Sequence, residues 1–92
     1  MDNVERFKEI CQQMSDTYAA KNHDYGNNNF VEKCKKRKYQ NALSRMEEKL
    51  ERFENLLDKD AKVNESAKDS LLDLACYAVM TYMAYEELSR EQ

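Results

Sequence analysis

Apolar residues recur from the start of the chain at alternating spacings of three and four, which is the period of an amphipathic α-helix. Asp2 or Asn3 precedes this pattern and offers a side-chain oxygen to the free backbone N–H groups of a first turn. The pattern predicts a helix over residues 3–22. Its apolar stripe consists of Val4, Phe7, Cys11, Met14 and Tyr18.

A second stripe predicts a helix over residues 35–57. Its seam is suited to packing against antiparallel neighbours. Acidic residues follow one border of the seam and basic residues the other, which is typical of a solvated, salt-bridged helix exterior. The seam consists of Tyr39, Leu43, Met46, Leu50, Phe53 and Leu57. The acidic border consists of Glu47, Glu51 and Glu54, and the basic border consists of Arg45, Lys49 and Arg52.

A third helix is predicted over residues 65–89, with Asn64 or Ser66 as its cap. Between residues 71 and 85 it is apolar nearly all round, so it must be buried on two sides. Three helices cannot easily provide that burial, and we therefore expect this helix to contribute to a subunit interface. One apolar face consists of Leu71, Ala75, Ala78 and Tyr82, and the opposite face of Cys76, Tyr77 and Met80.

Residues 22–33 have no helical period and contain the single glycine, Gly26, together with four asparagines. Glycine adopts positive φ without a Cβ penalty, and asparagine tolerates that region better than most residues. We predict the main loop of the chain over residues 22–33. It is either a polar connector or a functional segment.

The composition supports an all-α fold. The chain of 92 residues has one glycine and no proline, so it lacks the residues that build tight turns. This length predicts one helical domain over residues 1–92, with a small core. We predict a three-helix antiparallel bundle whose core is completed by association into a homo-oligomer.

Charge and cysteine content restrict the setting of the protein. The formal net charge of −3 gives no reason to expect general binding to duplex nucleic acid. The last helix is too short and too charged for a membrane span. Three cysteines without CxxC spacing, and no signal peptide, predict a cytoplasmic location. Neither Cys11 nor Cys76 is expected to be a nucleophile, because His23 is the only histidine and offers no clear base.

Asp69 and Asp73 are one helical turn apart at the start of the last predicted helix. Asp73 has apolar neighbours, so its ionised carboxylate needs a cation, a metal or several donors. One interpretation is an interhelical ion pair or hydrogen bond to a Lys, Arg or Tyr. The other is a Mg²⁺ site, in which either Glu48 and Glu51 or Glu47 and Glu51 face the two aspartates.

Three segments carry a resemblance to a known family. Residues 21–26 read Lys-Asn-His-Asp-Tyr-Gly, residues 45–53 read Arg-Met-Glu-Glu-Lys-Leu-Glu-Arg-Phe, and residues 63–78 contain Val-Asn-Glu-Ser followed by Asp-Ser-Leu-Leu-Asp-Leu-Ala-Cys-Tyr-Ala. They resemble the KNxDYG, RMxDKxxRL and VxES…DTLLDLANYA motifs of the first nucleotide-modification-associated domain family, whose members are small phage and bacterial proteins. The combination is more specific than any one motif.

The helical pattern of that family is similar in turn to the MazG and dUTPase type of all-α nucleotide pyrophosphohydrolase. Those enzymes hold Mg²⁺ with an ExxE pair and an ExxD pair. The resemblance implies Glu48 and Glu51 as the first pair and Asp73 as the final acid. This chain departs from the pattern, because Ser70 lies three residues before Asp73 and the acid, Asp69, lies four before.

The resemblance implies a nucleotide, or a small molecule derived from one, as the ligand. If the protein is a Mg²⁺-dependent pyrophosphohydrolase, Glu48, Glu51, Asp69 and Asp73 hold the metal. The nucleotide then contacts Lys21, Asp24, Tyr25, Gly26, Lys49 and Arg52. Two alternatives are a non-catalytic binder, such as a phage protein that sequesters a nucleotide signal of host defence, and a helical interaction module without a ligand.

Overall fold

The computed structural model describes residues 2–25, 29–58 and 64–91, and the side chains of residues 23–25 and 64–66 are outside this description. The described residues form four helices and no strand, which confirms the all-α class. The helices are α1 (Asn3–Tyr25), α2 (Asn29–Arg37), α3 (Gln40–Leu56) and α4 (Asn64–Arg90).

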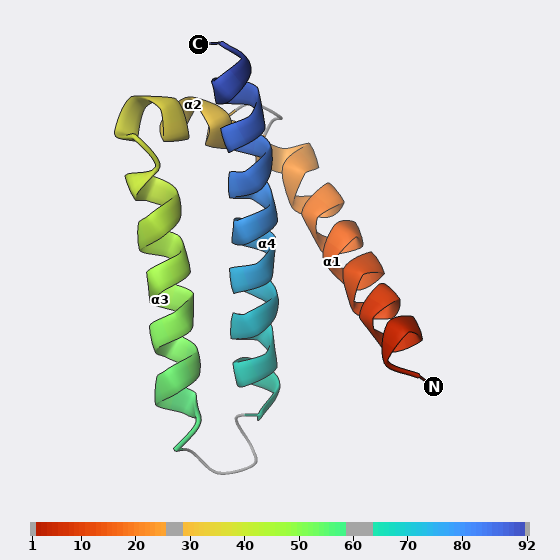
Figure 1. Cartoon of the computed structure of the whole chain (residues 1–92). Coiled ribbons are helices and arrows are strands. Elements are labelled where there is room, and N and C mark those ends of the chain that lie inside the picture. Colours follow the sequence, from red (N-terminus) through yellow and green to blue (C-terminus); the bar gives the residue numbers. More distant parts are fainter. Residues whose placement is uncertain (1, 26–28, 59–63, 92) are drawn as a thin grey trace.

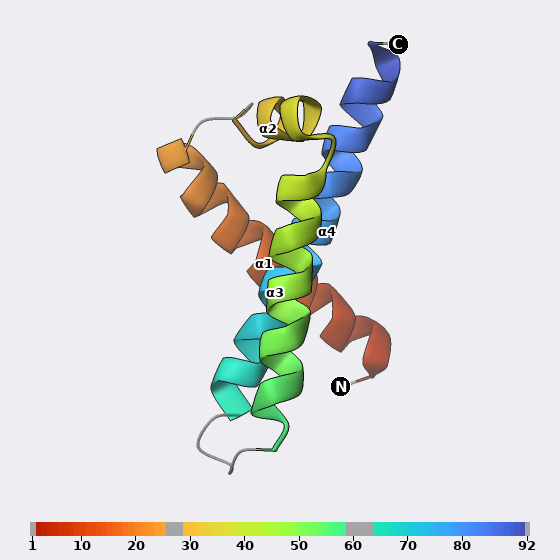
Figure 2. The same ribbon diagram turned by 90° about the vertical axis from the view of Figure 1, so that its left-hand side faces the viewer.

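Helices α3 and α4 lie side by side and antiparallel, and the short helix α2 runs across one end of the pair (Figure 1). Helix α1 crosses α4 obliquely instead of lying along it, and its N-terminal part diverges from α4 (Figures 1 and 2). The N-terminal residues of the first apolar stripe are therefore left in solvent, and Phe7 is 71% exposed. The predicted three-helix bundle is replaced by a helical pair with one crossing helix and one end helix.

The predicted helix over residues 35–57 is present as α3 from Gln40 to Leu56, but its predicted start is wrong, because the chain breaks at Lys38 and Tyr39. Both residues have positive φ, 52° and 68°, which no α-helix accommodates. The N–H of Tyr39 donates to the carbonyl of Cys34 at 3.0 Å, the bond that closes a Schellman motif at the end of α2. The carbonyl of Tyr39 then accepts the first hydrogen bond of α3, from the N–H of Leu43 at 2.9 Å.

The predicted loop over residues 22–33 is also too long. Helix α1 continues to Tyr25 and α2 begins at Asn29, so most of this segment is helical. The other two boundaries agree better with the sequence. The Asp2 carboxylate accepts the N–H of Glu5 at 2.8 Å and so caps α1, as predicted, and α4 begins at Asn64.

The core is small and lies at the end of the molecule where α2 meets α3 and α4. Within the described residues, its buried hydrophobic side chains are Cys34, Ala42, Ala84 and Leu88. Phe30, Val31, Tyr39 and Met46 pack around them. Cys34 is the buried cysteine, whereas Cys11 and Cys76 are half-buried. None of the described helices is long and apolar enough to cross a membrane.

Candidate functional site

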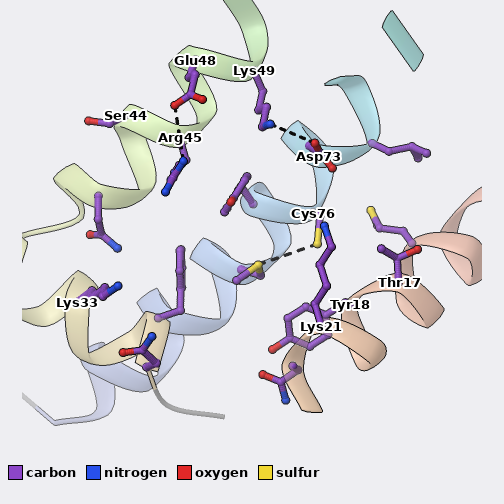
Figure 3. Close-up of a pocket in the computed structure, with 18 of the residues that line it drawn as sticks. Thr17, Tyr18, Lys21, Lys33, Ser44, Arg45, Glu48, Lys49, Asp73 and Cys76 are labelled. Carbon is purple, nitrogen blue, oxygen red and sulfur yellow. Dashed lines mark hydrogen bonds and ion pairs between the residues drawn. The ribbon is translucent and has the colours of Figure 1, made fainter. Parts of the chain in front are cut away.

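A cleft of about 930 Å³ lies between α1 and the other three helices. Its walls come from the C-terminal half of α1, one side of α2, the N-terminal half of α3 and the middle of α4. The oblique crossing of α1 opens this space. Helix α1 crosses α4 near the middle of α1, and the C-terminal end of α1 lies away from the α3–α4 pair (Figure 2). Figure 3 shows the side chains that surround the cleft.

Basic side chains dominate the charge of the cleft. They come from three helices and surround the opening: Lys21 from α1, Lys33 and Arg37 from α2, and Arg45 and Lys49 from α3. The acidic side chains of the lining are Glu48, Asp69 and Asp73. The cleft therefore carries a positive balance although the whole chain carries −3. A concave site of this kind attracts small anions more strongly than the rest of the surface does.

Two of the acidic side chains are paired with cations in the cleft. Lys49 Nζ lies 3.2 Å from Asp73 Oδ2, which links α3 to α4 (Figure 3). Arg45 Nη1 lies 3.8 Å from Glu48 Oε2 within α3. Of the two interpretations of Asp73 drawn from the sequence, the structure shows the interhelical ion pair.

The remaining cations are available to a ligand. Within the described part of the chain, Lys21, Lys33 and Arg37 form no ion pair. Lys21 is exposed, and its side chain extends from α1 toward Cys76 of α4 (Figure 3). Lys33 and Arg37 are one turn apart on α2, so they face the cleft together.

Aromatic rings line the cleft together with these cations. Phe30 of α2 and Tyr77 of α4 have ring centroids 6.4 Å apart at an angle of 33°. Tyr18 lines the cleft from α1. Rings of this kind present flat apolar surfaces to which a planar heterocycle can stack.

Asn41 of α3 places an unsatisfied acceptor beside the cleft. Its amide nitrogen donates to Cys34 Sγ at 3.5 Å, whereas its side-chain oxygen is buried and has no hydrogen-bond partner among the described residues. A buried carbonyl oxygen without a donor is costly. The cleft wall therefore contains a polar group that the protein fold itself leaves unsatisfied.

Cys76 also lines the cleft, and its thiol is not activated. Burial raises the pKa of Cys76, the nearby Lys21 ammonium lowers it, and the Asp73 carboxylate raises it further. The thiol donates to Met80 Sδ at 4.0 Å. A thiol that stays protonated at neutral pH is a poor nucleophile, as the sequence led us to expect.

The carboxylates do not form a metal centre in this arrangement. Among the residues that the structure describes, no group of three or more His, Cys, Asp or Glu side chains is placed to hold an ion. Asp73 and Glu48 are engaged by Lys49 and Arg45. Binding of Mg²⁺ by Glu48, Glu51, Asp69 and Asp73 therefore stays a prediction.

The structure brings together five of the predicted site residues: Lys21, Glu48, Lys49, Asp69 and Asp73 all line the cleft. Glu51 and Arg52 are exposed on α3 and are not part of the lining. The predicted contacts of Asp24 and Tyr25 concern side chains outside the described part of the structure, and Gly26 lies outside the described residues.

Several lining residues were not predicted as site residues. Lys33 was missed because residues 22–33 were treated as a loop, and Arg37 because it was placed in one long helix over residues 35–57. Their spacing of four in a basic segment is nevertheless a helical signal. Arg45 was noted in the basic border of its helix but not assigned to the site. Phe30, Asn41 and Tyr77 have no signal of their own, because their place in the cleft depends on how four helices meet.

Comparison with known proteins gives the family. Residues 21–84 match the family model described as nucleotide modification associated domain 1, which is more than half of the chain. The chain belongs to this family. The match confirms the resemblance drawn from the three motifs, and it contains the α2, α3 and α4 walls of the cleft. Searches of curated proteins and of solved structures found no match. The MazG-like resemblance stays a prediction.

Proposed function

We propose that the cleft binds a nucleotide or a nucleotide-derived small molecule through its phosphate and its base. The observation that supports this function most strongly is the positive cleft in a negatively charged chain. If these basic side chains only stabilised the fold, we would expect them to form charge pairs on the surface. A purely stabilising role does not explain why cations from three helices converge on one cleft. The family, which is associated with nucleotide modification, gives independent support for a nucleotide as the ligand.

The phosphate groups are expected to contact Lys33 and Arg37 of α2 and Lys21 of α1. These three cations form no ion pair within the described residues, so a ligand does not have to break one to reach them. Arg37 can donate two parallel hydrogen bonds to one phosphate, whereas each lysine acts as a point charge. Hydrogen bonds to charged groups contribute about 1.5–3 kcal/mol each.

The base is expected to stack on the aromatic wall that Phe30, Tyr77 and Tyr18 form. Stacking of one base on an aromatic side chain is worth about 1–3 kcal/mol. The cleft volume of about 930 Å³ lies at the upper end of the range of roughly 300–1,000 Å³ for small-molecule sites. It therefore accommodates both parts of a nucleotide.

Hydrolysis of the nucleotide is the second candidate function. Glu48, Asp69 and Asp73 in the same cleft favour it, since carboxylates at a phosphate site are typical Mg²⁺ ligands. It requires Lys49 and Arg45 to release the acids that they hold. Binding without metal requires no such rearrangement, and for that reason it is the function we place first.

Calorimetric titration with a panel of nucleoside mono-, di- and triphosphates, in EDTA and then with Mg²⁺, tests the proposal. We expect binding in EDTA that weakens as salt is raised, because the contacts are electrostatic. Release of pyrophosphate or phosphate is measured in the same samples. Hydrolysis that requires Mg²⁺ would favour the enzyme, and no binding in either buffer would refute a nucleotide site in the cleft.

Helix α2 offers a matched pair of variants. Lys33→Gln with Arg37→Gln removes two cleft cations, and Lys35→Gln with Lys36→Gln removes the same charge from the part of α2 that does not line the cleft. The first variant should lose roughly a hundredfold in affinity, about tenfold per contact. The second should lose little. Equal losses would mean that net charge, and not the cleft, attracts the ligand.

A further inference from the structure

The side of the α3–α4 pair that faces away from the cleft is apolar and exposed. Leu43, Leu50 and Leu57 are seven residues apart on α3, so they form one stripe along it, and Leu50 is 47% exposed. On α4, the corresponding exposed residues are Leu71, Tyr82 and Tyr85, and Tyr82 is 68% exposed. We call these six residues the apolar face.

Helical geometry places the apolar face opposite the cleft. At about 100° per residue, Leu50 lies roughly 140° around α3 from Arg45, and Tyr82 lies roughly half a turn around α4 from Asp73. The rings of Tyr39 and Tyr85, 6.0 Å apart, join the two helices on this side. Helix α2 and the C-terminal end of α1 lie on the other side of the pair, whereas the N-terminal half of α1 extends past the pair to the side of the apolar face (Figure 2). The two sides of the pair thus differ in chemistry, one polar and concave, the other apolar.

The chain exposes more surface than a compact monomer of its size does. Its accessible surface is 7479 Å², whereas a folded monomer of this mass exposes about 5,600 Å². Its radius of gyration is 15.0 Å, against about 12 Å for a compact domain of this length. The excess of about 1,900 Å² per chain is more than twice the roughly 800 Å² that each partner contributes to a standard interface.

We propose that the apolar face binds the same face of a second copy of this chain, so that two α3–α4 pairs form a four-helix core. A second copy is the partner because the excess area is more than enough for the roughly 800 Å² that each partner contributes to a standard interface, and because the seven-residue repeat on α3 is able to interdigitate with its own copy. A two-fold axis brings identical surfaces together, so no different partner is required. The cleft stays open in this dimer, since it lies on the opposite side.

The first test is the mass of the intact protein, measured by light scattering and by sedimentation equilibrium. We expect a dimer at micromolar concentration that persists in molar NaCl, because an apolar interface is not screened by salt. A monomer at about 100 µM would overturn the proposal. Because only folded chains associate, the midpoint of thermal unfolding should also rise with protein concentration. A constant midpoint would overturn the proposal too.

Variants locate the interface. Leu50→Glu places one carboxylate from each copy in the apolar core of the dimer, so association should weaken by roughly a hundredfold or more. Asn55→Glu is the matched control, on the exposed side of α3 roughly 140° away from Leu50, and should leave the mass unchanged. Phe7→Glu tests the other exposed apolar segment, at the start of α1. If it separates the subunits while Leu50→Glu does not, the proposed surface is wrong.

If the Leu50→Glu variant does not fold, a footprinting experiment on the wild-type protein can still test the interface. Hydroxyl-radical labelling of the wild-type protein, at high and at low concentration, should show Leu50 and Tyr82 protected in the dimer and labelled in the monomer. Lys33 and Arg37, in the cleft, should keep the same accessibility at both concentrations. Protection at the cleft with none at the apolar face would overturn the proposal.

Discussion

Lys49 and Asp73 form an ion pair across α3 and α4 at 3.2 Å, inside the positively charged cleft that is the candidate site. The two side chains are 22% and 40% exposed, so the pair is partly screened by water. Its contribution to stability is expected to be about 1 kcal/mol or less. The pair matters more for binding, since it sets whether Lys49 is available to an anion.

The first prediction follows from this competition. Asp73→Asn should raise the affinity for a nucleoside triphosphate in EDTA several-fold, because the amide no longer holds the Lys49 ammonium. In the Asp73→Asn background, where Lys49 is released, Lys49→Met should lower the affinity by about tenfold. In the wild-type background it should lower the affinity less, because Asp73 holds Lys49. Calorimetry on the two variants and on the double variant gives the coupling between the residues. If Asp73 instead holds a metal that the ligand requires, Asp73→Asn will weaken binding in Mg²⁺, contrary to this expectation.

The sequence predicted five of the residues that line the cleft, but it did not predict the break between α2 and α3. Asp73 was expected to need a partner because its neighbours are apolar, and Lys49 was expected at the site as a contact of the nucleotide. Lys33 and Arg37 could not be assigned to the cleft, because the helix that carries them was not recognised. That helix ends at Lys38 without the glycine or proline that normally marks such a turn. The exposure of the N-terminal end of α1 could not be predicted either. Its apolar stripe is continuous in the sequence, and only the angle at which α1 crosses α4 leaves the stripe in solvent.

The second prediction concerns the unsatisfied oxygen of Asn41. Leu is close to Asn in size and has no polar atoms, so Asn41→Leu removes the buried acceptor at the loss of one weak hydrogen bond to Cys34. The free energy of unfolding should stay the same or rise by about 1 kcal/mol. Urea denaturation measures this, with Gln40→Leu, at the exposed start of α3, as the control that should change it little. A loss of 2 kcal/mol or more would mean that the amide makes a stronger contact than the structure shows.

The third prediction is a dependence of stability on pH through Cys34. Burial raises the pKa of this thiol above its ordinary value of 9.0, and the hydrogen bond from Asn41 opposes the rise. Folding raises the pKa of this acid, so its contribution to stability is fully present below pH 9, where the thiol is protonated in both the folded and the unfolded state. That contribution is lost as the pH rises through the pKa of the folded state. The free energy of unfolding should therefore fall between pH 8 and pH 10.

Cys34→Ala isolates this effect from other groups. Tyr39 titrates with a raised pKa as well, because of burial and of the Cys34 and Tyr85 charges near it, so the wild-type curve alone is ambiguous. Because Cys34 is fully buried, the variant also loses packing free energy, and this loss is nearly the same at every pH. The stability difference between wild type and Cys34→Ala should shrink as the pH rises. A difference that stays constant would show that the Cys34 thiol does not titrate in this range.

The last prediction uses the break between α2 and α3. Lys38 occupies the position after the helix end in a Schellman motif, with φ of 52°, where glycine is the preferred residue because a Cβ costs about 1–2 kcal/mol in the left-handed region. Lys38→Gly relieves that cost and adds some flexibility to the unfolded chain, so the free energy of unfolding should rise by up to about 1 kcal/mol. Lys36→Gly makes the same substitution inside α2, where glycine should lower the free energy of unfolding by about 1 kcal/mol. Urea denaturation of both variants measures the two signs. If both substitutions destabilise the protein equally, the chain around residue 38 is helical, and α2 and α3 form the continuous helix that the hydrophobic pattern alone predicts.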